Sequence, residues 1–207
     1  MRSSVLISVI FAVALVVMPA PSWPAPASLD FPPTKLTIYN SEGTETIGHA
    51  LYSLETVGGK AFVHGENRYL DGEYDIENDE IDVKPSGGLQ RLLTFRHEYF
   101  APNGSLQIVD VADFRAKTGS CTVFEGNVPV VNKKTFDFPR DTYAGAAVLI
   151  PLQYFLRRGV TEGISFHDFN CVPEPKVFKV RAKAAPLAAW DPYPGRVVKV
   201  RVKPDFG

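Results

Sequence analysis

Cysteine is scarce in this chain, and neither sign of charge dominates. Two cysteines among 207 residues are too few for a disulfide-dominated scaffold or a four-ligand zinc site. The 22 basic and 23 acidic residues give a net charge of −1. The chain therefore lacks the positive field that binding to nucleic acid or to an anionic membrane needs, and we expect no nucleic-acid partner. No motif of a large enzyme family is present, so we assign no catalytic residue, metal ligand or cofactor.

What is present is the composition of one ordinary globular domain. Apolar residues make up 45% of the sequence and aromatic residues 12%, which excludes a disordered or collagen-like chain. Because no second linker interrupts the pattern, the sequence predicts a short N-terminal extension at residues 28–34 and a single β-rich domain at 35–207.

The first 27 residues have the pattern of a secretory signal peptide. Arg2 precedes an apolar run from Val5 to Val17, which is too short to span a bilayer, and a proline-rich segment follows it. The small residues Ala25-Pro26-Ala27 form the preferred cleavage site, and a cut after Ala20 is the alternative. We therefore expect an exported protein, periplasmic or extracellular, without a transmembrane anchor in the mature chain.

Export gives the two cysteines a role. In an oxidising compartment Cys121 and Cys171 are expected to form a disulfide with each other. A reactive thiol and two buried free thiols are the alternatives. The disulfide requires the two residues to be adjacent in space.

Short segments of alternating polarity, separated by turn residues, predict antiparallel strands from Lys35 onward. The expected strands are 36–39, 46–54, 61–70, 89–100, 105–114, 120–124, 128–138, 163–170, 176–182 and 197–202. Between 74 and 83 the sequence predicts a hairpin in which residues 77–80 form the loop.

In residues 141–158 the polarity no longer alternates as it does in the predicted strands. Residues 141–158 have Asp141 at a candidate N-cap, arginines in the last turn and few polar positions. This predicts one apolar helical region, either kinked at Pro151 or divided into two short helices of which Pro151 opens the second. The predicted fold class is mainly β (α+β): a curved antiparallel sheet or half-barrel closed by this kinked helix.

Acidic residues concentrate between Asp71 and Asp82, where seven carboxylates occur. Hard cations such as Ca²⁺ prefer clustered oxygen ligands, but the spacing matches no calcium-binding loop. The favoured interpretation is a solvated hairpin whose acids discourage edge pairing. Arg157 and Arg158 are explained by the helix dipole, with anion binding as the alternative.

The four histidines give no catalytic constellation. His167 and Cys171 share a strand face but lie about 13 Å apart by strand rise, too far for proton transfer. An enzyme using His97 or His167 is the least favoured hypothesis, because no nucleophile or orienting group can be placed beside either residue.

Three weak motifs accompany this order of elements: Ile47-Gly48, the turn from Phe100 to Leu106, and Tyr154 to Gly159 ahead of renewed strands. With them, residues 35–204 resemble periplasmic lipoprotein carriers of the LolA/LolB type and a related family of exported bacterial proteins. The resemblance implies a curved sheet whose hollow, closed by helix, suits acyl chains. The single helical region and the cysteine pair depart from those carriers, so no functional residue is carried over.

The leading hypothesis is therefore a non-enzymatic envelope protein that binds a lipid or acyl chain between sheet and helix. The candidate ligand-binding residues, chosen by strand alternation and helix spacing, are Phe95, Tyr99, Tyr143, Val148, Leu152 and Phe155. The alternative is an interaction or scaffold module whose core is filled by its own side chains. The sequence identifies neither a protein partner nor an oligomeric state.

Overall fold

The structure is a computed structural model. It describes residues 31–39, 45–83, 89–126, 128–148, 151, 163–171, 174–185 and 199–205. The predicted signal peptide, residues 1–27, lies outside the described residues. The first strand begins at Phe31, inside the segment predicted as an extension.

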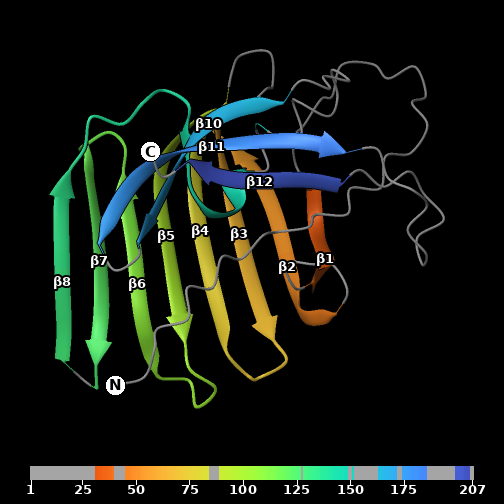
Figure 1. Cartoon of the computed structure of the whole chain (residues 1–207), viewed down its shortest axis with the longest axis vertical. Helices are drawn as coiled ribbons and strands as arrows, with labels where there is room; N and C mark the ends of the chain where they lie inside the picture. The colour runs from red at the N-terminus through yellow and green to blue at the C-terminus, as the bar shows by residue number, and fades with distance from the viewer. Residues whose placement is uncertain are drawn as a thin grey trace.

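An eight-stranded antiparallel sheet forms the larger part of the fold (Figure 1). Its strands pair in sequence order, because each short turn returns the chain beside the strand it has just left. The strands are β1 (Phe31–Tyr39), β2 (Thr46–Val57), β3 (Lys60–Tyr69), β4 (Tyr74–Val83), β5 (Leu89–Phe100), β6 (Leu106–Asp113), β7 (Thr118–Glu125) and β8 (Val128–Thr135).

A smaller sheet crosses the upper part of the large sheet in the view of Figure 1. Its order is β12-β11-β10-β9, with β9 (Thr142–Tyr143), β10 (Ile164–Cys171), β11 (Pro175–Ala185) and β12 (Lys199–Asp205). The disulfide between Cys121 of β7 and Cys171 of β10 joins the two sheets, with a Cα–Cα distance of 5.6 Å. The predicted disulfide is confirmed.

The main core lies between the sheets. Ring edges meet there: the centroid of Phe169 on β10 lies 6.2 Å from that of Phe95 and 5.9 Å from that of Phe136. Small side chains of η1 (Gly145–Val148), a 3₁₀ helix, complete this core, with Ala147 buried in it. The small sheet has a second cluster built around Phe166 and Val180.

The predicted helical closure of the sheet is wrong. The described residues are nearly all β, the large sheet is open, and the predicted helix 141–158 begins instead with β9 and the single turn η1. Gly145 has a φ of 48°, a left-handed conformation that an α-helix cannot contain. Residues 149–150 and 152–158 of the predicted helix lie outside the described residues.

The alternating segments are strands, as predicted, with one exception. Residues 74–83 form the single strand β4, paired along its length with β3 and β5, so the predicted hairpin with a loop at 77–80 is wrong. Asp75, Glu77 and Asp79 are consequently buried and not solvated.

Candidate functional site

The register of the large sheet arranges its inner-face side chains in rows that cross the strands. Directly opposed partners in an antiparallel pair project to the same face, so a row is obtained by following partners from strand to strand. The polar row consists of Tyr52, Gly65, Glu77, His97, Asp110, Cys121 and Asn132. The mixed row consists of Ala50, Asn67, Asp75, Tyr99, Ile108, Val123 and Val130. The core row consists of Leu54, Val63, Asp79, Phe95, Ala112, Gly119 and Lys134.

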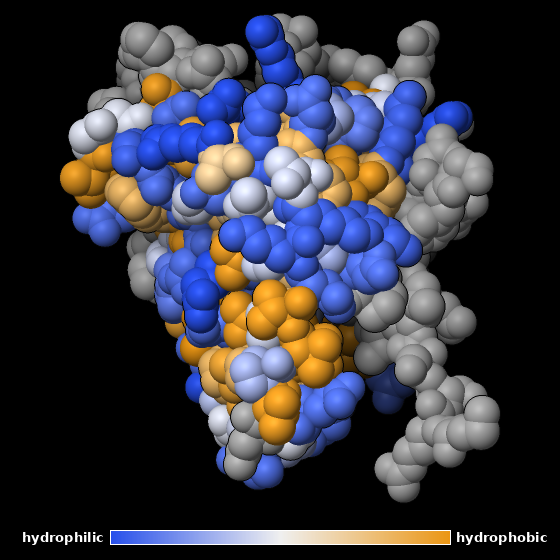
Figure 2. Space-filling model, turned by 90° about the vertical axis from the view of Figure 1, so that its left-hand side faces the viewer, coloured by the Kyte–Doolittle hydropathy of each residue, from blue (hydrophilic) through white to orange (hydrophobic). Residues whose placement is uncertain are grey.

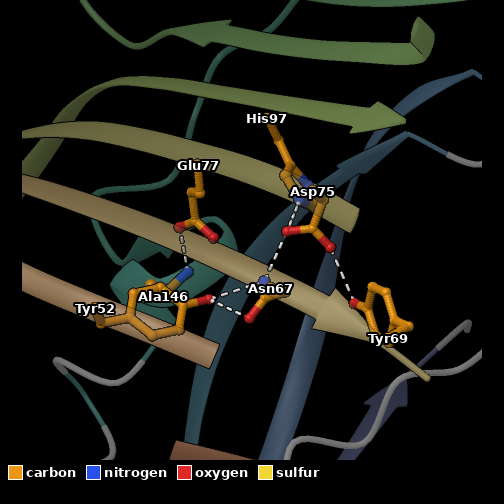
Figure 3. Close-up of polar contacts among 7 residues, drawn as sticks. All are labelled: Tyr52, Asn67, Tyr69, Asp75, Glu77, His97 and Ala146. Atoms are coloured by element: carbon orange, nitrogen blue, oxygen red, sulfur yellow. Dashed lines mark hydrogen bonds and ion pairs between the residues drawn. The ribbon is translucent and has the colours of Figure 1, made fainter. Parts of the chain in front are cut away.

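Asp75 is the centre of a buried hydrogen-bond network (Figure 3). It is 0% exposed, and its Oδ1 accepts from Asn67 Nδ2 at 2.6 Å and pairs with His97 Nε2 at 2.9 Å. Its Oδ2 accepts from the Tyr69 hydroxyl at 2.9 Å. Tyr52 completes the network through Asn67, at 3.2 Å from Asn67 Nδ2. Asp75 is therefore held directly by its two neighbouring strands, β3 and β5, and indirectly by β2 through Asn67.

Glu77 joins the large sheet to η1. Its buried carboxylate accepts a hydrogen bond from the backbone N–H of Ala146 (Figure 3). Burial raises the pKa of Glu77, and the neighbouring Asp79 side chain, the charge of His97 and the Ala146 N–H partly offset this rise. A carboxylate at the first turn of η1 satisfies a backbone N–H that the turn leaves free, which fixes η1 on β4.

The contact between η1 and Glu77 predicts a difference between two glycine substitutions. A Cβ at Gly145 would overlap the Glu77 carboxyl group, whereas a Cβ at Gly58 would have nothing within 4 Å, and both residues have positive φ. We expect Gly58→Ala to lower the free energy of unfolding by about 1 kcal/mol through backbone strain, and Gly145→Ala by roughly 2–4 kcal/mol because the overlap adds to the strain. Urea denaturation measures both; equal losses would show that η1 does not pack on Glu77.

Asp79 and Asp110 carry buried oxygens that are not hydrogen-bonded. Asp79 is 3% exposed and Asp110 6% exposed, and no described residue donates to either oxygen of Asp79 or to Oδ1 of Asp110. Burial raises the pKa of Asp79, and the charge of Glu77 raises it further. Burial raises the pKa of Asp110 to about 7, although His97 lowers it somewhat. An unpaired carboxyl group is costly in a protein interior, so Asp110 marks a functional candidate.

The described residues do not form a metal centre here. The three-residue group with suitable spacing is Asp110 with Cys121 and Cys171, whose ligand atoms lie within 4.8 Å of one another. Both sulfurs are in the disulfide and offer no thiolate, so this set does not fit a metal ion.

An apolar shelf adjoins Asp110 on the inner face. We define the shelf as Tyr99, Ile108, Val123, Val128 and Val130, none of which belongs to the core cluster. It lies toward the lower ends of β5–β8 in Figure 1, away from the small sheet. Val130 is 40% exposed and Val128 64%. Figure 2, which faces the β8 edge, shows a hydrophobic patch low on this side.

The structure places the predicted ligand-binding residues in separate locations. Phe95 is 3% exposed and fully packed in the core, whereas Tyr99, two residues later on the same face of β5, is on the shelf. Tyr143 and Val148 pack on the cluster around Phe166. Leu152 and Phe155 lie outside the described residues.

His167 does pair with a carboxylate, but not with one anticipated from the sequence. Its Nδ1 lies 2.9 Å from Asp141 Oδ1 at a partly exposed position. The hydroxyl of its cross-strand partner Thr142 is buried and has no hydrogen-bond partner among the described residues, so His167 does not activate it. This pair therefore gives no catalytic arrangement.

The sequence interpretation missed Asp75, Glu77, Asp79 and Asp110. Three of them could have been found from the sequence. Asp75, Glu77 and Asp79 are spaced two residues apart in line with Ile81, so they project to the same face as this apolar residue, which is 0% exposed. For Asp110 the signal was weaker: it lies next to Val109 and Val111 in β6, where alternation alone does not identify the covered face.

No helix in the described part of the chain has the length and apolar character needed to cross a membrane. The resemblance to lipoprotein carriers stays a prediction. Comparison with known proteins finds no match to this chain, whether among family models, curated proteins or solved structures.

Proposed function

We propose that this is an exported, non-enzymatic protein that binds a hydrophobic ligand on the apolar shelf. The observation that carries the proposal is the row Tyr99, Ile108, Val123 and Val130, a run of cross-strand partners on the inner face that the core does not use. The site differs from the helix-closed pocket expected from the sequence, because the shelf is formed by strands alone.

The dimensions and chemistry of the shelf support this proposal. Three inter-strand spacings separate β5 from β8, which makes the row about 14 Å long. That length matches an extended dodecyl chain. Val128 and Val130 are exposed, and Tyr99, Ile108 and Val123 are partly exposed. Apolar side chains that adjoin one another on one accessible face are typical of binding surfaces, whereas scattered ones are ordinary.

Export is part of the proposal. The Cys121–Cys171 disulfide supports an oxidising compartment, since such bonds rarely persist in the cytosol. The N-terminal sequence pattern supports secretion. We propose the periplasm or the extracellular space as the location.

Two valines of β8 provide a matched test. Val130 is on the shelf, and Val131, which is 58% exposed, faces the opposite side of the same strand. We expect the neutral dye Nile red to bind the wild-type protein with a rise in fluorescence. Val130→Asp should weaken binding roughly tenfold, because it removes a valine contact and adds a charge. Val131→Asp should bind the dye like the wild type.

Two outcomes would contradict the proposal. Equal weakening by the two substitutions would place the dye elsewhere. If the folded wild-type protein does not bind Nile red or any lipid extract component, the alternative of an interaction module with a filled core replaces it.

A further inference from the structure

We propose that the ligand carries a basic group, an ammonium or a guanidinium, and that the carboxylate of Asp110 binds this group. The inference rests on the proposed function, because the apolar part of the same ligand occupies the shelf. It names the chemical class of the ligand as a cationic amphiphile with a single alkyl chain.

The first argument is the position of Asp110. On β6, Asp110 follows the shelf residue Ile108 by two positions, so both side chains project to the inner face about 7 Å apart. Asp110 also lies directly opposite Cys121, and the next residue of β7 on this face is Val123 of the shelf. A chain that lies on the shelf from Val128 of β8 toward Ile108 of β6 therefore places its head group next to Asp110.

The second argument is that Asp110 has unused bonding capacity. Its Oδ1 is buried and no described residue donates to it. Asp75, by contrast, has Asn67, Tyr69 and His97 as partners. A donor supplied by a ligand would satisfy the Asp110 oxygen, and a charged donor would do so most strongly.

The third argument is the charge of the inner face. The buried carboxylates in the three rows are Asp75, Glu77, Asp79 and Asp110. Among the described residues of those rows, His97 is the buried basic side chain, and it is paired with Asp75. Lys134, at the β8 end of the core row, binds Glu174 at 2.5 Å. Above its pKa of about 7 Asp110 is charged, and His97, its basic cross-strand partner, is already paired with Asp75, so a cation is favoured over an anion of the same chain length.

A competition experiment tests the inference. Dodecylammonium, dodecanoate and neutral dodecanol share one alkyl chain and differ in the head group. With Nile red bound to the wild-type protein at pH 8, we expect dodecylammonium to displace the dye at a concentration roughly tenfold lower than dodecanoate, since a charged hydrogen bond is gained. Dodecanol should lie between the two.

The matched substitutions are Asp110→Asn and Glu98→Gln. Each removes one negative charge, but Glu98 is on the outer face of β5, where it pairs with Arg96. Asp110→Asn should bring the ratio of the two displacement concentrations to about one. Glu98→Gln should keep the wild-type ratio. The inference would be overturned if Asp110→Asn left the ratio unchanged. It would also be overturned if dodecylammonium and dodecanoate displaced the dye from the wild-type protein at the same concentration.

The pH dependence of the wild-type protein provides a second measurement that needs no substitution. The titratable groups facing Asp110 are His97 and Tyr99 on β5 and Glu77 on β4, with Asp168 on β10 near Glu77. Because the pKa of Asp110 is about 7, dodecylammonium should displace the dye more strongly at pH 8 than at pH 6. Dodecanol should show no such change. A flat profile for the amine would also overturn the inference.

The possible failures can be told apart. If Nile red binds and the three competitors displace it equally, the shelf is a binding site without a preference for cations, and only the inference fails. If neither the dye nor any of the three competitors binds, the proposed function fails.

Discussion

Replacing both cysteines with alanine is expected to lower the free energy of unfolding by about 4 kcal/mol, because the disulfide closes a long loop of the unfolded chain. The bridge joins Cys121 and Cys171 across a sequence separation of 50 residues. It is also a covalent connection between the two sheets, so its loss acts on the packing of Phe169 against Phe95 of β5 and against Phe136, which follows β8, as well as on the unfolded chain.

Urea denaturation of the double variant and of the oxidised and reduced wild-type protein measures this effect. The reduced wild type should resemble the double variant. As a control, Thr122→Ala changes the neighbouring residue of β7 on the outer face and should cost less than about 1 kcal/mol. A denaturation midpoint that does not respond to reduction would show that the disulfide does not constrain the unfolded chain as expected.

The protein is expected to become more stable as the pH falls from 8 to 6, which is the reverse of ordinary acid destabilisation. Burial raises the pKa of Asp110 from its ordinary value of 3.8 to about 7. Burial, reinforced by the charge of Glu77, likewise raises that of Asp168 to about 7. A carboxyl group whose pKa is higher in the folded state binds protons more tightly there. Unfolding therefore becomes easier as the pH rises from the pKa of the unfolded chain through the pKa of the folded protein.

His97 acts in the same direction. Burial lowers its pKa, but the hydrogen bond and the charge of Asp75 outweigh burial and raise the pKa overall. A histidine with a raised pKa contributes stability that is present at low pH and is lost as the pH rises through its folded value. The carboxylates and the histidine thus favour the folded protein under mildly acidic conditions.

Asp110→Asn removes one of these groups and should raise the free energy of unfolding at pH 8 by roughly 2–4 kcal/mol, with little change near pH 4. The control is Asp137→Asn at an exposed position, where Lys117 lowers the pKa of the carboxyl group through a hydrogen bond and its charge. That variant should show no gain at pH 8. Urea midpoints at a series of pH values measure both. If Asp110→Asn has the same pH profile as the wild type, Asp110 does not titrate as expected.

The strands illustrate what alternation in a sequence can establish. The segments at 46–54, 61–70 and 89–100 are predicted from local polarity, and each forms a strand because its turns return it to a neighbour. The predicted hairpin at residues 74–83 is wrong because it assumes that only apolar residues mark the covered face. In β4 the covered face carries Ile81 and also Asp75, Glu77 and Asp79.

The predicted helix was wrong for a different reason. Apolar residues without a strand period indicated a helix from Asp141, but the contacts of Gly145 and Ala146 with Glu77 require a left-handed glycine and a single turn. Those contacts join residues 69 positions apart. Local sequence preference does not contain them, so tertiary packing overrides it.

Local polarity in the sequence is enough to predict a β-rich chain and the positions of most strands, and the two cysteines predict the disulfide, but the helix-closed fold class is wrong. Tertiary packing determines which face of each strand is covered, and therefore that carboxyl groups of β4 and β6 are buried beside an apolar shelf. The physical reason is that a period of two identifies the residues that share a face, whereas the second sheet, packed from a distant part of the chain, determines which face is removed from water.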